Sequence, residues 1–208
     1  MIEDQETQQM VDFFAAEVEK QLVNQFPDKG KPLTRLWLNQ FKIHYNNYEH
    51  MMVDSVAKRH GINSIFVMAM DDVLCEVHAS YSQLKDTVIS VYRSMLQEYF
   101  DSEAQRIRRS EDPWGTFVEW IRAGNEKNYR NDYFLLEEVP AEGNCYSFNM
   151  NRCLYYEILR EAGKPELGPI LCEYDRILTE SFSDWVILRR HETIASGDKH
   201  CTFRYCKK

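Results

Sequence analysis

Apolar residues recur at helical spacing through the first part of the chain. Met10, Phe14, Val18 and Leu22 follow one another at four-residue steps, which is the spacing of a single helix face. The segment "FPDKGKP" interrupts this helix. The same spacing predicts further helical stretches over about 33–56, 63–109 and 113–124, with a break in the second near 71–72.

The pattern changes after about residue 130. In "NCYSFNMN" the apolar positions Tyr146, Phe148 and Met150 alternate with Cys145 and polar residues, which is typical of a strand with one covered face. Further strands are predicted in "DYFLLEEVP", "DWVILRRHETIA" and "KHCTFRYC". We expect strands near 144–150, 184–194 and 199–206 to share one antiparallel sheet, with a helix over 152–162 packed on it.

These patterns predict an α+β fold in a single domain over residues 1–208. A helix-rich part, residues 1–126, packs with residues 130–208, which contain a small antiparallel sheet and shorter helices. We expect the second part to carry the functional site, because the polar and thiol side chains discussed below gather there.

The net charge of the chain argues against some classes of binding partner. The chain of 208 residues has a formal net charge of −8, which argues against nucleic acid and anionic membranes as partners. The first residues do not form a signal peptide, and no stretch approaches the apolar length of a membrane span. We therefore expect a cytoplasmic protein with a small-molecule partner, and the sequence leaves a homo-oligomer open.

Six cysteines are present, at positions 75, 145, 153, 172, 201 and 206. In a reducing compartment they are expected to be free thiols, mostly buried. Five of the six fall in the last third of the chain, which indicates where a site lies.

Cys153 stands at the predicted start of a helix, with Asn151 as the expected cap and Arg152 beside it. Unpaired N–H groups there favour an anion, so a thiolate would be stabilised and the thiol pKa would fall. The alternative is a small buried residue beside a solvated Arg152.

Further along, Cys172 and Asp175 are three residues apart and neighbour each other on a predicted helix. Asp175 is either an acid–base group or an ion-pair partner. In "ILRRHETIA" alternation predicts Arg189, His191 and Thr193 on one face of a strand and Arg190 on the other, and His191 is a possible general base.

The cysteines are also potential metal ligands. Cys153, Cys172, Cys201 and a histidine have the donor types of a tetrahedral zinc site, but zinc ligands usually include one short fixed spacing and here the gaps are long. We therefore expect no metal and no cofactor, and packing is the favoured role of Cys201.

The last 65 or so residues, "NMNRCLYYEILREAGKPELGPILCEYDRIL…ETIASGDKHCTFRY", resemble the L-2-amino-thiazoline-4-carboxylic acid hydrolase family. Thr202 stands where the family pattern usually has an acid. More distantly, the cysteine-rich ending is similar to 4-vinyl-reductase-like small-molecule-binding domains, although Thr193 stands where their zinc-binding pattern has a cysteine. The residues that carry the first resemblance are Arg152, Cys153, Leu167, Gly168, Cys172, Asp175, Thr193, Ala195, Gly197, Cys201, Phe203 and Arg204.

The resemblance implies a hydrolase that acts on a non-peptide cyclic C–N bond in an enclosed pocket. Water would add to the carbon between nitrogen and sulfur of a cyclic amidine and open the ring to N-carbamoyl-cysteine. We assign Cys153 as nucleophile or its electrostatic substitute, Asp175 as amidine partner and proton relay, and Arg152 or Arg190 as carboxylate clamp. The remaining expected site residues are His191 as a general base and, lining the substrate, Asn149, Cys172, Thr193 and Cys201.

Two other readings stay open. One is a binding or sensor module that uses the same pocket without turnover. The other is an enzyme that acts on a different cyclic amidine, lactam or imine.

Overall fold

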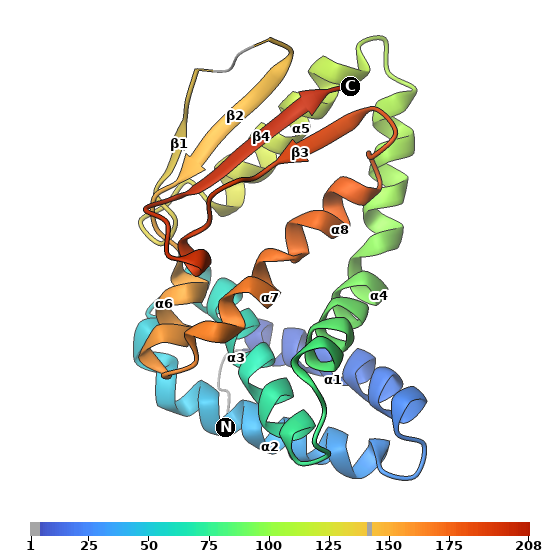
Figure 1. Ribbon diagram of the computed structural model, residues 1–208, viewed down its shortest axis with the longest axis vertical. Coiled ribbons are helices and arrows are strands. Elements are labelled where there is room, and N and C mark those ends of the chain that lie inside the picture. The colour runs from blue at the N-terminus through green and yellow to red at the C-terminus, as the bar shows by residue number, and fades with distance from the viewer. Residues whose placement is uncertain (1–4, 141–142) are drawn as a thin grey trace.

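The computed structural model describes residues 5–140 and 143–208, and long helices make up its first half (Figure 1). The apolar stripe that begins at Met10 buries Phe14, Val18 and Leu22 in the core, as the spacing predicts. The long helices are α1 (Gln5–Gln25), α2 (Gly30–Tyr48), α3 (Ser55–Cys75), α4 (Tyr81–Arg108) and α5 (Pro113–Asn128), with a short 3-10 helix, η1, at Glu49–Met51.

Side-chain caps set several helix boundaries that the apolar pattern placed wrongly. Asp54 caps α3, so this helix begins earlier than the predicted residue 63 and the segment "RHGIN" lies inside it. Ser80 caps α4, and the break therefore falls just before it and not near 71–72. Asp112 caps α5, which continues past Gly124 to Asn128.

The strands form one antiparallel sheet, which confirms the expected arrangement. The order in the sheet is β1-β2-β4-β3. β3 is shorter than the expected 184–194 because the chain leaves the sheet at Arg190 and Thr193 then caps a short 3-10 helix, η3 (Ile194–Ser196). The strands are β1 (Leu136–Glu138), β2 (Cys145–Met150), β3 (Val186–Arg189) and β4 (Cys201–Lys207).

The helix expected to pack on the sheet lies elsewhere. Leu154, Ile158 and Leu159 of this helix join the core cluster that contains α3, so it packs against the helical part. The covered face of the sheet instead packs against α5 and the end of α4, through residues such as Phe117 and Ile107. The helices of the second half are α6 (Leu154–Glu161), η2 (Pro165–Leu167), α7 (Gly168–Cys172) and α8 (Tyr174–Glu180).

The predicted α+β class is therefore confirmed, and the two parts share their cores. One apolar cluster runs from Val11 in α1 to Ile177 in α8, and the other runs from Ala104 in α4 to Tyr205 in β4. In Figure 1 the sheet lies at the top with α5 behind it, α1–α3 and α6 lie at the bottom, and α7 and α8 run between them.

A disulfide joins Cys145 in β2 to Cys206 in β4. The two residues are directly opposite each other in the antiparallel register, and their Cα atoms are 4.0 Å apart. The expectation of free thiols is wrong for this pair, because the register of the strands brings them together. Cys75, Cys153, Cys172 and Cys201 are free.

Candidate active site

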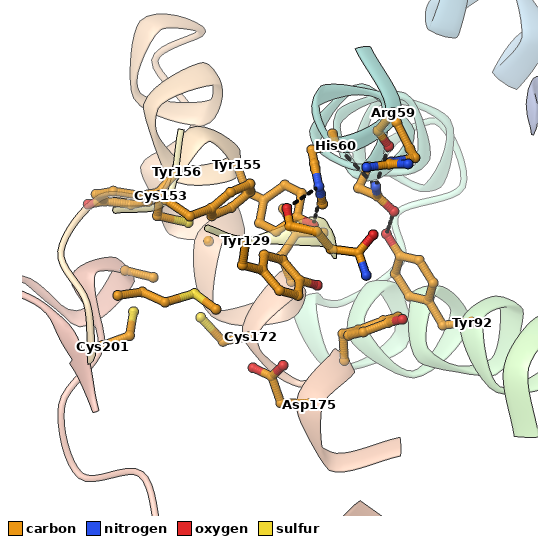
Figure 2. Close-up of a pocket in the computed structure, with 18 of the residues that line it drawn as sticks. Arg59, His60, Tyr92, Tyr129, Cys153, Tyr155, Tyr156, Cys172, Asp175 and Cys201 are labelled. Atoms are coloured by element: carbon orange, nitrogen blue, oxygen red, sulfur yellow. Dashed lines mark hydrogen bonds between the residues drawn. The ribbon is translucent and has the colours of Figure 1, made fainter. Parts of the chain in front are cut away.

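A cavity of about 320 Å³ lies between the helical part and the sheet. Its size falls in the range of small-molecule sites, and its wall is mostly apolar. Residues from α1, α3 and α4 line it together with residues from α6, α7, α8 and β4 (Figure 2). Residues 130–208, which were expected to carry the site, therefore supply only part of the cavity wall.

Asp175 and Arg190 form an ion pair in this wall. Asp175 lies at the start of α8, and Arg190 directly follows β3. Nη1 of Arg190 donates to Oδ2 of Asp175, and Nη2 donates to the carbonyl oxygen of Cys172 at 2.8 Å. Burial raises the pKa of the Asp175 carboxyl, while attraction to Arg190 acts against this rise. The guanidinium also lies over the ring of Phe203, 5.3 Å from its centroid.

Three free thiols line the same cavity: Cys153, Cys172 and Cys201. Figure 2 shows them gathered on one side of it. Burial raises the pKa of all three, to about 12 for Cys172, and each also lies near other acidic groups of the site. At neutral pH these side chains are therefore protonated thiols.

The prediction of a thiolate at Cys153 is thus wrong. Cys153 is the residue immediately before α6, with an extended backbone, so it is not inside the first turn. Backbone N–H groups of Tyr155 and Tyr156 do lower the pKa of its thiol, as the sequence predicts, but burial raises this pKa by more. Asn151, the expected cap, donates to the carbonyl oxygen of Leu135 at 3.3 Å instead.

Gly168 lets α7 approach the rest of the site closely. A Cβ atom at this position would lie 2.8 Å from the ring of Tyr156 and 2.9 Å from the Cβ of Ala195. Any larger residue would push α7, which carries Cys172, away from the opposite wall.

Four of the expected site residues do not line the cavity. Arg152 forms a bidentate ion pair with Glu157, in which Nε donates to Oε1 at 2.7 Å and Nη2 donates to Oε2 at 2.8 Å. Asn149 accepts a hydrogen bond from Arg204 in the neighbouring strand, and Thr193 bonds to Ser196 within the η3 turn. His191 has an exposed side chain. Of the two proposed carboxylate clamps, the fold brings only Arg190 to the cavity; the residues absent from its wall are Arg152, Asn149, Thr193 and His191.

The helical part supplies a buried histidine that the sequence analysis missed. Nε2 of His60 lies 2.9 Å from the carbonyl oxygen of Asn128, and Nδ1 lies 2.8 Å from the hydroxyl of Tyr155. A carbonyl oxygen only accepts, so Nε2 carries the proton and Nδ1 accepts from Tyr155. Burial and the nearby Arg59 lower the pKa of His60 to about 4, so the ring is neutral at physiological pH.

A second polar pair lies beside His60. The hydroxyl of Tyr92 donates to Oδ1 of Asn63 at 2.9 Å, and Nδ2 of Asn63 donates to the carbonyl oxygen of His60 at 2.9 Å. The sequence held one signal for this group: Arg59, His60 and Asn63 come shortly before a run of six apolar residues, 65–70, that is buried on all sides of the helix.

No metal-binding cluster emerges from the thiols. Within residues 5–140 and 143–208, no three side chains of His, Cys, Asp or Glu are arranged to hold a metal ion.

No helix in this described part combines the length and apolar character needed to cross a membrane.

Comparison with known proteins identifies the family. The family model described as L-2-amino-thiazoline-4-carboxylic acid hydrolase matches residues 45–205. This match begins in α2, so the likeness extends well beyond the C-terminal segment in which the sequence motifs were recognised. No curated protein and no solved structure matches the chain. Because the match covers most of the chain and includes nearly every segment that lines the cavity, the chain belongs to the L-2-amino-thiazoline-4-carboxylic acid hydrolase family.

Proposed function

We propose that this protein hydrolyses a small cyclic amidine, of the 2-amino-thiazoline-4-carboxylate type, inside the cavity. The observation that carries the proposal is the ion pair of Asp175 and Arg190 in the cavity wall, next to three thiols. The family description supports a hydrolase of this substrate class.

The charges of the pair complement those of such a substrate. An amidine presents two N–H donors that match the two oxygens of a carboxylate, and a substrate carboxylate matches a guanidinium. Arg190 uses two of its five N–H donors in the contacts described above, so donors remain for a ligand. We assign Asp175 to the amidine and Arg190 to the substrate carboxylate.

The reaction requires water to add to the amidine carbon. In the proposed step, Asp175 takes a proton from the attacking water and the oxygen bonds to this carbon. Raising the pKa of the Asp175 carboxyl by burial makes it a better base than an exposed aspartate. As the oxygen adds, the C=N double bond becomes a single bond, and the ring nitrogen keeps the proton that it carries in the amidinium form. The ring then opens as one bond to the carbon breaks, the leaving atom receives the proton from Asp175, and the added hydroxyl releases its proton to solvent as the carbonyl forms.

Two ring bonds meet at the amidine carbon. Breaking the C–S bond gives N-carbamoyl-cysteine with a free thiol, whereas breaking the C–N bond gives an S-carbamoyl product with a free amine. The C–N cleavage inferred from the sequence does not lead to N-carbamoyl-cysteine. We therefore propose C–S cleavage, in which Asp175 returns the proton to the departing sulfur.

Cys153 is the alternative nucleophile. Its thiol would add to the same carbon to form a covalent intermediate, which water would later release. The raised pKa of this thiol favours the water mechanism, because a thiol must lose its proton before it attacks.

The test is incubation of the purified protein with L-2-amino-thiazoline-4-carboxylate in ¹⁸O-labelled water. We expect time-dependent release of one free thiol per substrate, measured with a thiol-reactive chromophore, and one ¹⁸O atom in the carbamoyl group, measured by mass spectrometry. Free amine without free thiol would instead show C–N cleavage. Absence of both products would refute the proposed activity on this substrate.

A binding module without turnover is the second candidate. It is favoured by one observation, the mostly apolar wall of the cavity, which offers contact to a ligand but few reacting groups. Calorimetric binding of the same thiazoline without product formation would support it. A panel of other cyclic amidines, lactams and imines tests the remaining alternative, an enzyme with a different substrate.

A further inference from the structure

Arg59 lies in the cavity wall on the side away from the thiols. Figure 2 shows Arg59, His60 and Tyr92 on one side of the cavity and Cys153 and Cys201 on the other. Arg59 comes from α3, and its side chain is partly buried. It is a lining cation in a mostly apolar cavity.

The other polar groups around Arg59 already have protein partners. Both ring nitrogens of His60 are hydrogen bonded, and Tyr92 and Asn63 bond to each other. The guanidinium of Arg59, in contrast, forms no ion pair with any side chain in the described part of the chain. A partly buried guanidinium without a carboxylate is a site for an anion.

Apolar side chains make up much of the remaining wall of the cavity. A small ring held by Asp175 fills only part of a cavity whose volume of about 320 Å³ is in the range of drug-sized ligands. The rest of the wall offers van der Waals contact and few hydrogen bonds. The apolar lining residues include Phe14, Met95, Leu96, Phe134, Met150 and Leu171.

We propose that the cavity takes an elongated substrate, with the reacting ring at Asp175, an apolar arm along the middle and a carboxylate at Arg59. The position of the ring rests on the proposed function. The recognition of the arm and its carboxylate rests on Arg59 and the apolar wall, and a binding experiment tests it without any turnover.

The probe is 4-phenylbutyrate, which has an aromatic arm and a carboxylate but no reacting ring. Its neutral counterpart is 4-phenylbutanamide. We expect isothermal titration calorimetry to show that the carboxylate binds at least about tenfold more tightly than the amide, since a charge-assisted hydrogen bond is worth more than a neutral one.

Variants of Arg59 test whether this residue causes the preference for the carboxylate over the amide. Arg59→Gln should abolish the preference for the carboxylate, and Arg59→Lys should keep part of it because the charge remains. The matched control is Arg160→Gln, an exposed position on α6 outside the cavity wall, which should keep the full preference. Circular dichroism and thermal melting verify that each variant is folded.

Equal binding of carboxylate and amide to the unaltered protein would overturn the inference. A preference that persists in Arg59→Gln would also overturn it and would assign the carboxylate to Arg190. Either result leaves hydrolysis of the parent thiazoline untouched. Conversely, absence of hydrolysis with an intact Arg59-dependent preference would refute the proposed function alone.

Discussion

Asp175 and Arg190 form an ion pair that borders two spaces at once. Both residues line the cavity of the candidate site, and both also line a groove on the outer surface between α8 and β3. Their side chains are 26% and 15% exposed, so neither charge is fully solvated. Each charge of such a pair is stabilised more by the other charge than by water. Loss of either residue therefore destabilises the folded protein.

The first prediction concerns stability. Arg190→Met should lower the free energy of unfolding by about 3–5 kcal/mol, because it leaves Asp175 buried without a counter-charge. The double variant Asp175→Leu/Arg190→Met should lose much less. Urea denaturation measures both, and Arg108→Met is the control, because its exposed pair with Asp184 is worth only about 0–1 kcal/mol. Equal losses in the single and double variants would contradict the dependence of one charge on the other.

The second prediction concerns turnover. Asp175→Asn keeps the shape of the side chain and removes its charge and its basicity. We expect kcat for thiazoline hydrolysis to fall by about 10²–10⁴-fold, the usual contribution of a general acid–base group. Asp184→Asn, on the outer surface, serves as the control and should retain normal kcat. An Asp175→Asn enzyme with nearly normal kcat would exclude Asp175 as the proton relay.

Much of the fold follows from local pattern. The alternation of Tyr146 and Phe148 correctly predicted a strand, and the apolar stripe of Phe14 and Val18 correctly predicted α1. The position of α6 could not be predicted, because its apolar face fits a sheet and a helix equally well. Only the tertiary fold decides that Leu154 packs against α3.

The third prediction concerns the cavity thiols. Iodoacetamide at pH 8 should modify exposed Cys75 in the native protein well before Cys153, Cys172 and Cys201, because those three thiols are less accessible to the reagent, whereas the pKa is raised for all four. Peptide mass spectrometry over time gives the order of modification. Fast modification of Cys153 would contradict this prediction and would support the thiolate that the sequence predicted.

The fourth prediction separates the two possible nucleophiles. Under the water mechanism, Cys153→Ser should keep kcat within about tenfold and cost about 1 kcal/mol of stability, since a hydroxyl replaces a sulfur in a mostly apolar wall. A decrease in kcat of several orders of magnitude would instead identify Cys153 as a covalent nucleophile. Trapping of a thiol-linked intermediate by mass spectrometry provides the independent check.

The fifth prediction concerns pH. The pKa of His60 is about 4 in the folded protein and 6.5 when unperturbed, so the unfolded chain binds this proton first as the pH falls. Stability from neutral His60 is fully present above pH 6.5 and should be lost between pH 6.5 and about 4, by on the order of 3 kcal/mol. Denaturation of the native protein and of His60→Gln across this interval measures the difference. A His60→Gln variant with the same pH dependence would contradict this account.

Only part of the site could be predicted from the sequence. Asp175 and Cys172 were identified because they stand in a recognisable short motif near the end of the chain, and Arg190 was identified among the polar residues of the segment "ILRRHETIA". His60 and Arg59 were missed because they reach the cavity from a helix more than ninety residues earlier, and hydrogen bonds such as that between His60 and Tyr155 exist only after folding. Arg152 was chosen for its place beside Cys153, but Glu157 engages its guanidinium outside the cavity.

The cavity wall extends along the chain from Met10 in α1 to Phe203 in β4, and β4 is an inner strand of the sheet. During synthesis on the ribosome, the helices of the first half emerge long before the strand that completes the opposite wall. Contacts so distant in sequence are among the slowest to form. A nascent chain would therefore hold an open, apolar half-cavity until β4 arrives, and such exposed apolar surface is prone to aggregation.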